Sequence, residues 1–277
     1  MLRSHNSGRV PGGSVGTMTA QHVSRFCALA VYAIASLTAC SPPTELGPAG
    51  PPCSPPAASA LVLVVAVHQG ASSPSVPVAA ACEVESAIRS TTPISVVTAE
   101  GRPRLVLRSA TWSLNDGQPE SANPQAYQDD LTVAHSTVLT AVQTAEASSE
   151  HHDLLAALTM AADQGRQTGS TTRVLIVDNG LSDSGAVDMT RPGMTAADPP
   201  GEVADFLAAH GGCPASLAGT SMTMYGAGYG VEPQQKLSLR QVDQVGKIWQ
   251  AVIAACGADS TWFRHRARSR DPRPGTP

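Results

Sequence analysis

Several kinds of residue are scarce in this chain. Aromatic side chains make up 4% and charged side chains 14% of the 277 residues, and lysine occurs only at positions 236 and 247. No apolar run reaches the roughly 18 residues that a membrane-spanning helix needs, which excludes such a helix. Glycine and proline show no periodic spacing, which excludes a collagen-like chain. A chain of this length forms one large or two small domains with a sizeable core.

Positive charge is scarce in the central part of the sequence. Residues 1–39 contain three arginines and no acid, and residues 264–277 contain five arginines and one acid. The central residues 40–263 contain 10 basic and 21 acidic side chains, a net charge of −11. A nucleic-acid-binding core needs a basic face that neutralises phosphates. The acidic centre therefore argues against a nucleic-acid-binding core, and no nucleic-acid partner is expected.

The only long apolar run near the start, residues 26–39, has the features of a signal-peptide h-region, so residues 1–39 are predicted to form a signal peptide. The run is 14 residues long, follows Arg25 and is too short to span a bilayer. It ends in Leu37-Thr38-Ala39-Cys40, which resembles the bacterial lipobox, in which an invariant cysteine is lipidated and becomes the mature N-terminus. This resemblance implies a palmitate-bearing lipoprotein on the outer face of the cell membrane. The alternative is an ordinary secretory leader with a chance cysteine. Met18 is a second candidate start.

The segments that flank the central region are predicted to lack a packed core. Residues 41–59 contain seven prolines and two glycines, so residues 40–59 are predicted to form a Pro-rich tether. Residues 259–277 are predicted to form a basic, disordered tail, with contact to anionic lipid headgroups as the alternative. The folded domain is expected over residues 60–258.

Cysteine usage fits an exported protein. Once the leader is removed and Cys40 is lipidated, four cysteines remain, and an oxidising compartment favours their pairing. We predict one disulfide among Cys82, Cys213 and Cys256, because Cys53 lies in the tether, a poor place for a buried bridge. Buried free thiols are the alternative, since free cysteine is among the most buried residue types.

Strand and helix patterns alternate along the central region. Continuous apolar runs indicate strands buried on both faces, and the last helical stretch repeats apolar residues at intervals of three and four. This alternation predicts a three-layer, doubly wound α/β domain with a mostly parallel sheet. Strands are expected at residues 60–68, 93–98, 104–112, 173–177 and 221–225. Helices are expected at residues 76–90, 123–148, 153–165, 202–210 and 242–256.

Ligands of open α/β sheets bind beyond the carboxyl ends of the strands. This rule places the candidate binding edge in the loops that follow the expected strands. Its members are His68, Ser72, Asp178, Ser182 and Asp183.

Two short motifs carry a family resemblance. The run Val174-Leu-Ile-Val-Asp178-Asn-Gly180, preceded by Asp153-Leu-Leu-Ala-Ala-Leu158, resembles the von Willebrand factor type A (vWA) domain. Residues 65–68, 178–185 and 248–252 look more narrowly like exported actinobacterial vWA-like modules, which are often followed by OmpA-like domains. The resemblance covers roughly residues 60–257 and implies a Rossmann-like sheet and a protein-binding role.

The resemblance also implies a divalent-metal site on three loops, which this sequence matches only in part. The family's first loop is Asp-x-Ser-x-Ser, whereas this chain has His68 and Gly70 at the first two ligand positions, and only Ser72 fits. Asp178 fits the last loop, and the family's threonine position falls near His152-Asp153. We therefore expect no bound metal or cofactor. If Mg²⁺ binds, Ser72 and Asp178 are its ligands, and Asp183 is either a replacement ligand or a solvated loop acid.

Three classes of function remain open. The first is a non-enzymatic module that binds an unidentified envelope protein. The second is an exported hydrolase that uses His68, Asp178 and Cys213, although no nucleophile motif accompanies them. The third is a solute-binding lipoprotein, which usually has two lobes. The pair His151-His152 is interpreted as a polar helix N-terminus, because adjacent residues point to different sides and chelate poorly.

Overall fold

The computed structural model describes residues 58–67, 76–146, 150–169, 171–196, 201–228 and 236–263. The chain divides into two units, and the first, Met1–Ala49, contains none of these residues. Every element below belongs to the second unit, Gly50–Pro277. The expected leader, the lipidation site Cys40, most of the tether and residues 264–277 lie outside the described residues.

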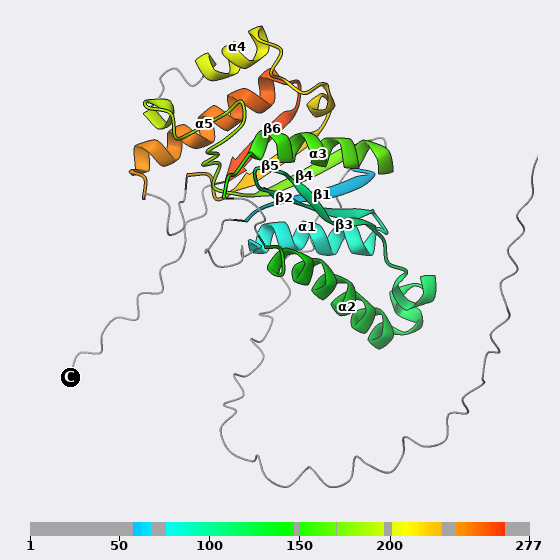
Figure 1. Cartoon of the computed structure of the whole chain (residues 1–277). Coiled ribbons are helices and arrows are strands. Elements are labelled where there is room, and N and C mark those ends of the chain that lie inside the picture. Colours follow the sequence, from blue (N-terminus) through cyan, green and yellow to red (C-terminus); the bar gives the residue numbers. More distant parts are fainter. Residues whose placement is uncertain are drawn as a thin grey trace, which may run out of the picture. The chain divides into compact units, whose positions relative to one another are not determined.

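A six-stranded sheet forms the centre of the domain (Figure 1). The strand order is β3-β2-β1-β4-β5-β6, and every neighbouring pair is parallel except β2 and β3, which are antiparallel. The strands are β1 Ala60–Ala66, β2 Ile94–Ala99, β3 Arg104–Ala110, β4 Thr172–Val177, β5 Ser221–Tyr225 and β6 Asp259–Phe263. This arrangement confirms the predicted doubly wound α/β fold with a mostly parallel sheet.

Helices cover both faces of the sheet (Figure 1). The helices α1 Val78–Arg89 and α2 Pro124–Gln143 lie on one face, and α3 Leu154–Thr168, α4 Gly201–Ala209 and α5 Leu239–Ala255 lie on the other. Short 3-10 turns occur at Leu114–Gly117, Glu120–Ala122, Met194–Ala196 and Ala215–Leu217.

The central strands explain why the apolar runs in the sequence are continuous. In β1, Leu61, Leu63 and Val65 pack toward α1 and α2. The intervening Val62 and Val64 pack toward the α3 and α5 side. Successive strand residues point to opposite faces, so a strand covered on both sides needs apolar residues at every position.

Side-chain caps begin three of the helices. Asn123 accepts a hydrogen bond from the Ala126 N–H at the start of α2, and Asp153 accepts one from the Ala156 N–H at the start of α3. At the start of α5, Ser238 and Gln241 form a capping box. Such caps satisfy N–H groups that have no partner within the helix. The cap on α3 also fixes the segment that enters the candidate site.

Two predictions about element boundaries were wrong. The domain does not end at residue 258, because β6 adds an edge strand parallel to β5, with 2.8 Å between Thr223 Oγ1 and Thr261 Oγ1. Helix α2 ends at Gln143 and not at residue 148. Within the part of the chain that the structure describes, no helix combines the length and the apolar character needed to cross a membrane.

A disulfide joins Cys213 to Cys256, with 5.1 Å between their Cα atoms. It links the turn after α4 to the C-terminal end of α5. Both residues are among the three cysteines named as disulfide candidates from the sequence. Cys82, in α1, is also disulfide-bonded.

Candidate functional site

The candidate site lies at the carboxyl ends of the central strands. The strand order reverses between β1 and β4, and this is where open α/β sheets form a crevice. Asp178 directly follows β4 and marks this position. His68 and Ser72, the members of the expected edge that follow β1, lie outside the described residues. Asp178, Ser182 and Asp183 are all described.

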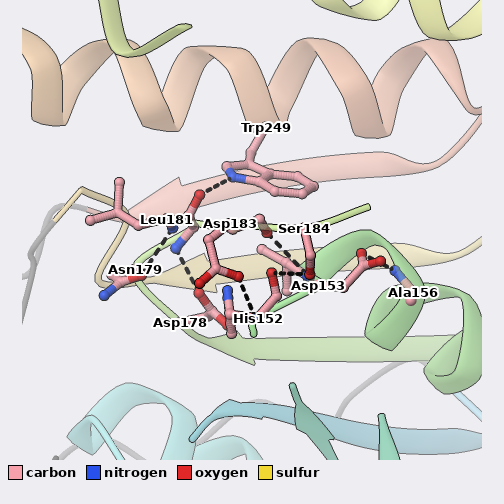
Figure 2. Close-up of polar contacts among 12 residues, drawn as sticks. His152, Asp153, Ala156, Asp178, Asn179, Leu181, Asp183, Ser184 and Trp249 are labelled. Atoms are coloured by element: carbon pink, nitrogen blue, oxygen red, sulfur yellow. Dashed lines mark hydrogen bonds and ion pairs between the residues drawn. The ribbon is translucent and has the colours of Figure 1, made fainter. Parts of the chain in front are cut away.

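The Asp178 carboxylate is buried and lies against His152 (Figure 2). Its side chain is 0% exposed. The Gly180 N–H donates a hydrogen bond to Asp178 Oδ1 at 2.6 Å, and Oδ2 lies 2.8 Å from His152 Nε2. Gly180 has a φ of +72°, a left-handed conformation that favours glycine, so the residue type allows the turn that returns its N–H to the carboxylate.

His152 comes from the segment just before α3 and is held from several directions. Its side chain is 2% exposed. Its backbone N–H donates to Asp183 Oδ1 at 2.6 Å. Its carbonyl accepts hydrogen bonds from the Asp183 N–H and from Ser184 Oγ, both at 3.1 Å. Figure 2 shows how these contacts join the segment before α3 to the loop after β4.

The electrostatics favour a charged imidazole at this site. Burial by itself lowers the pKa of His152, but the Asp178 carboxylate beside it raises that pKa, and Asp183 and Asp153 add to the effect. The net result is a pKa above the ordinary value for histidine. The raised pKa favours the protonated imidazole, which in that form pairs with the Asp178 carboxylate.

The β4 loop and the start of α3 form one connected unit. Ser182 is 0% exposed, and its Oγ accepts a hydrogen bond from the Leu154 N–H at 3.1 Å. A Cβ placed on Gly185 would lie 2.2 Å from Asp153 Oδ2, so this close approach requires glycine. The loop residues therefore add to the capping of α3 and hold His152 in place.

Helix α5 also holds the loop after β4 in place. The Trp249 indole is 1% exposed, and its Nε1–H donates to the Gly180 carbonyl at 2.8 Å. The backbone of the loop is also bonded to the end of β5, since the Asp178 N–H donates to the Tyr225 carbonyl at 3.1 Å and the Gly228 N–H donates to the Asn179 carbonyl at 2.7 Å. Helix α5, strand β5 and the segment before α3 thus fix the position of Asp178 at the end of β4.

The described residues do not fit the divalent metal that the vWA resemblance implies. Each Asp178 oxygen already takes part in a hydrogen bond, and the imidazole lies directly against the carboxylate. Among the residues described, no group of three or more His, Cys, Asp or Glu side chains is placed to hold a metal ion. Of the two ligands named from the sequence, Ser72 lies outside these residues and Asp178 is paired with His152.

Three interpretations of site residues change with the structure. His151 is 70% exposed and fits a polar helix N-terminus, but His152 does not, because it is buried against Asp178. Asp183 is not simply a solvated acid, since it accepts the His152 N–H. Cys213 is not available as the nucleophile of the hydrolase alternative, because its sulfur is bonded to Cys256. Sequence reasoning missed the role of His152, which it interpreted as part of a polar helix N-terminus.

Sequence comparison finds no protein-family model and no curated protein that matches this chain. We therefore infer function from the residues and their geometry.

Proposed function

We propose that this chain is an exported lipoprotein, anchored through lipid on Cys40, whose vWA-like domain binds a protein of the cell envelope at the carboxyl edge of its sheet. The lipobox-like Leu37–Cys40, placed directly after a signal-peptide run, supports the anchor and the extracytoplasmic location. The Pro-rich segment after Cys40 supports a tethered domain. The acidic central region supports a protein partner over a nucleic acid.

The burial of Asp178 carries the proposal that binding is independent of metal. A metal-dependent adhesion site offers an open coordination position to a carboxylate of the partner protein. Here the equivalent carboxylate is 0% exposed and lies 2.8 Å from His152 Nε2. The histidine supplies the positive charge that a cation would otherwise provide. The partner then contacts the surface of the loops and not a bound ion.

The surface offered to a partner is preorganised. Leu181 and Asp183 are partly exposed members of the β4 loop, and His151 is exposed beside them. The backbone of this loop is fixed by Trp249 and by His152, so little conformational entropy is lost on binding. A rigid scaffold that positions loop residues is a common arrangement for protein recognition.

The point at which the chain enters the domain supports this choice of edge. The Ser59 N–H donates to Thr171 Oγ1 at 2.9 Å, and the Thr171 N–H donates to Ser59 Oγ at 2.8 Å. These contacts lie at the amino ends of β1 and β4. The carboxyl edge is the length of a seven-residue strand away, roughly 20 Å. The first strand thus separates the binding edge from the point of entry.

Site-specific photocrosslinking in intact cell envelopes tests the binding edge. A photoreactive amino acid at Leu181 is expected to form an adduct with a discrete protein, and chelating divalent metals is expected to leave that adduct unchanged. The same amino acid at Ala218, an exposed residue before β5 at the opposite edge, is the control. Equal adducts at both positions, or loss of the Leu181 adduct on chelation, would contradict the proposal.

Metabolic labelling with palmitate tests the anchor. Label is expected in the intact chain and in Cys27→Ala, which alters a cysteine within the leader. Label is expected to be absent in Cys40→Ala. Incorporation that persists in Cys40→Ala would overturn lipidation at this residue.

One observation favours a second candidate function, an exported hydrolase. The Asp178–His152 pair has the arrangement of a carboxylate that orients a histidine base. Of the residues named for that role from the sequence, His68 lies outside the described residues and Cys213 is in a disulfide. Covalent labelling by a fluorophosphonate probe that is lost in His152→Ala would support the hydrolase over the binding module. Absence of labelling in the intact chain would count against it.

A further inference from the structure

We propose that the start of helix α5 is a docking patch for a protein segment that presents an apolar side chain beside acidic ones. The α5 patch consists of Met194, Lys236, Leu237, Leu239 and Arg240. Leu239 is 78% exposed, and among the large apolar side chains described only Val78 is more exposed. The inferred partner rests on the proposed function, because the α5 patch adjoins the binding edge named there.

Contacts on one side of the α5 patch join it to the β4 loop. A Cβ placed on Gly228 would lie 2.5 Å from the Cα atom of Val242, so the first turn of α5 packs directly on this glycine. The Gly228 N–H donates to the Asn179 carbonyl at 2.7 Å. Asn179 precedes Leu181 by two residues in the β4 loop. The start of α5 therefore borders the proposed binding edge.

Contacts on the other side join the α5 patch to the 3-10 turn Met194–Ala196. The Gln241 side-chain amide donates from Nε2 to Thr195 Oγ1 at 3.4 Å, and the turn packs against α5. Met194 and Leu237 are partly buried, and both pack against the core cluster that contains Trp249. The α5 patch is thus a continuation of the core to the surface, with Leu239 as its most exposed member.

The way in which α5 begins does not explain an exposed Leu239. Ser238 and Gln241 form a capping box that satisfies the N–H groups at the start of the helix. Leu237 precedes the cap, a position from which apolar residues commonly pack back against the helix. Leu239 is the first helical residue, yet most of its side chain remains in water. It therefore adds little to the stability of the domain itself.

Arg240 is also unfavourable for the helix that carries it. A helix N-terminus has a partial positive charge and favours acidic side chains, but the first turn of α5 contains no acid. Lys247 pairs with Asp243 at 3.4 Å, whereas neither Lys236 nor Arg240 forms an ion pair with a described residue. Residues that break local rules without a compensating contact are expected where a protein binds a partner.

The charges of the α5 patch indicate an acidic partner segment. Lys236 and Arg240 are exposed cations on either side of the two leucines, within a region whose net charge is −11. Electrostatic complementarity of this kind gives specificity and fixes the register of binding. An anionic bilayer is a poorer match, because it faces a wide area of the domain and is repelled by the remaining acidic surface.

Photocrosslinking from position 239 tests the patch in the full-length protein within intact cell envelopes. A photoreactive amino acid replaces Leu239, and mass spectrometry identifies the group to which it attaches. The expected adduct is a protein segment with acidic side chains next to the attachment site, and raised ionic strength is expected to reduce its yield. Attachment to lipid, or to a segment without acidic side chains, would overturn the inference.

Variants of Arg240 separate binding from folding. Arg240→Glu is expected to lose most of the Leu239 adduct, although the thermal midpoint rises by roughly 1–4 °C, because an acid suits the helix N-terminus. Arg240→Lys keeps the charge and is expected to keep the adduct. Arg108→Glu makes the same change at an exposed residue of β3 and is the control. Equal adduct yields in Arg240→Glu and Arg108→Glu would contradict an acidic partner.

The outcomes at positions 181 and 239 distinguish this inference from the proposed function. A discrete adduct at Leu181 with none at Leu239 would leave the binding edge standing and overturn the α5 patch. An acidic segment attached at Leu239, together with equal adducts at Leu181 and Ala218, would support the patch and defeat the edge. Absence of an adduct at both Leu181 and Leu239 would overturn both.

Discussion

His152 is a histidine that the fold buries next to the Asp178 carboxylate, which raises its pKa and so favours its charged form. A buried ion pair often contributes little net stability, because removing two charges from water costs about as much as their attraction returns. Removing one partner is different, since the other charge then remains buried without compensation. The contacts that fix the His152 backbone to Asp183 and Ser184 add to this cost, because they keep the segment from opening to water.

Substituting His152 with alanine is therefore expected to lower the free energy of unfolding by roughly 3–5 kcal/mol. The measurement is urea denaturation followed by circular dichroism. His151→Ala is the matched control, because His151 is adjacent but 70% exposed, and a change within about 0.5 kcal/mol is expected. Equal losses in the two variants would show that Asp178 does not depend on His152.

The same pair predicts a dependence of stability on pH. The pKa of His152 is raised in the folded state, so its contribution is complete below the unfolded value of about 6.5 and is lost as pH rises through the folded pKa. The stability difference between wild type and His152→Gln is expected to be constant below about pH 6.5 and to shrink as the pH rises above that value through the folded pKa. Urea unfolding at a series of pH values measures it. A difference that grows with pH would contradict a raised pKa.

Sequence reasoning located half of this ion pair. Asp178 was predicted at the binding edge because it directly follows an apolar strand, a local pattern. Its partner His152 lies 26 residues earlier, and only the packing of α3 beside β4 brings the two together. A histidine in a polar run before a helix has the same local pattern whether its side chain is solvated or buried. That distinction depends on tertiary structure.

At the scale of the element, helix α3 and the β4 loop depend on each other. Asp153 caps the helix, Ser182 accepts a second N–H of its first turn, and Gly185 provides the space for the Asp153 carboxylate. Each contact stabilises the helix start and also holds the segment that carries His152. Loss of the cap is therefore expected to affect both the helix and the site.

Substituting Asp153 with alanine is expected to cost about 1 kcal/mol, the usual effect of losing an N-cap. In a domain of this size the thermal midpoint falls by roughly 2–4 °C. Asp153→Asn keeps the accepting oxygen and is expected to restore most of the loss. Asp163→Ala, on the exposed side of the same helix, is the control for loss of a carboxylate. If Asp153→Asn is as unstable as Asp153→Ala, the capping hydrogen bond is not the cause.

The sequence predicted the buried strands and the edge strand β3 but missed the other edge strand, β6, for a physical reason. The strands β1, β4 and β5 are central, and burial on both faces imposes a continuous apolar pattern that is visible in the sequence. The sixth strand has a neighbour on one side only and includes the exposed residues Asp259 and Thr261, so its sequence carries no such pattern. Its pairing follows from the backbone and from the Thr223–Thr261 contact, neither of which is visible locally.

At the scale of the whole molecule, the disulfide between Cys213 and Cys256 holds together the part of the domain farthest along the chain. Helix α4 has nine residues, of which Ala204 and Leu207 are buried, so little apolar area fixes it. Cys256 ends α5, and the Gly219 N–H donates to the Gly257 carbonyl at 3.0 Å just before β6 begins. The bond thus connects α4 to the junction of α5 and β6.

Removing this disulfide is expected to loosen that region while leaving the central sheet intact. The cysteines are separated by 43 residues, a loop whose closure contributes roughly 4 kcal/mol in the chain-entropy description. The variant is Cys213→Ala with Cys256→Ala, because a reducing agent would also break the bond at Cys82. Hydrogen exchange is expected to accelerate in α4 and β6 and to remain slow in β1 and β4, whose ladders lie at the centre of the sheet.

Equal acceleration in all four elements would mean that the disulfide supports the global fold and not one region. The Cys82→Ser variant, measured alongside, separates this effect from a general response to losing a covalent bond, because Cys82 lies in α1 on the opposite face.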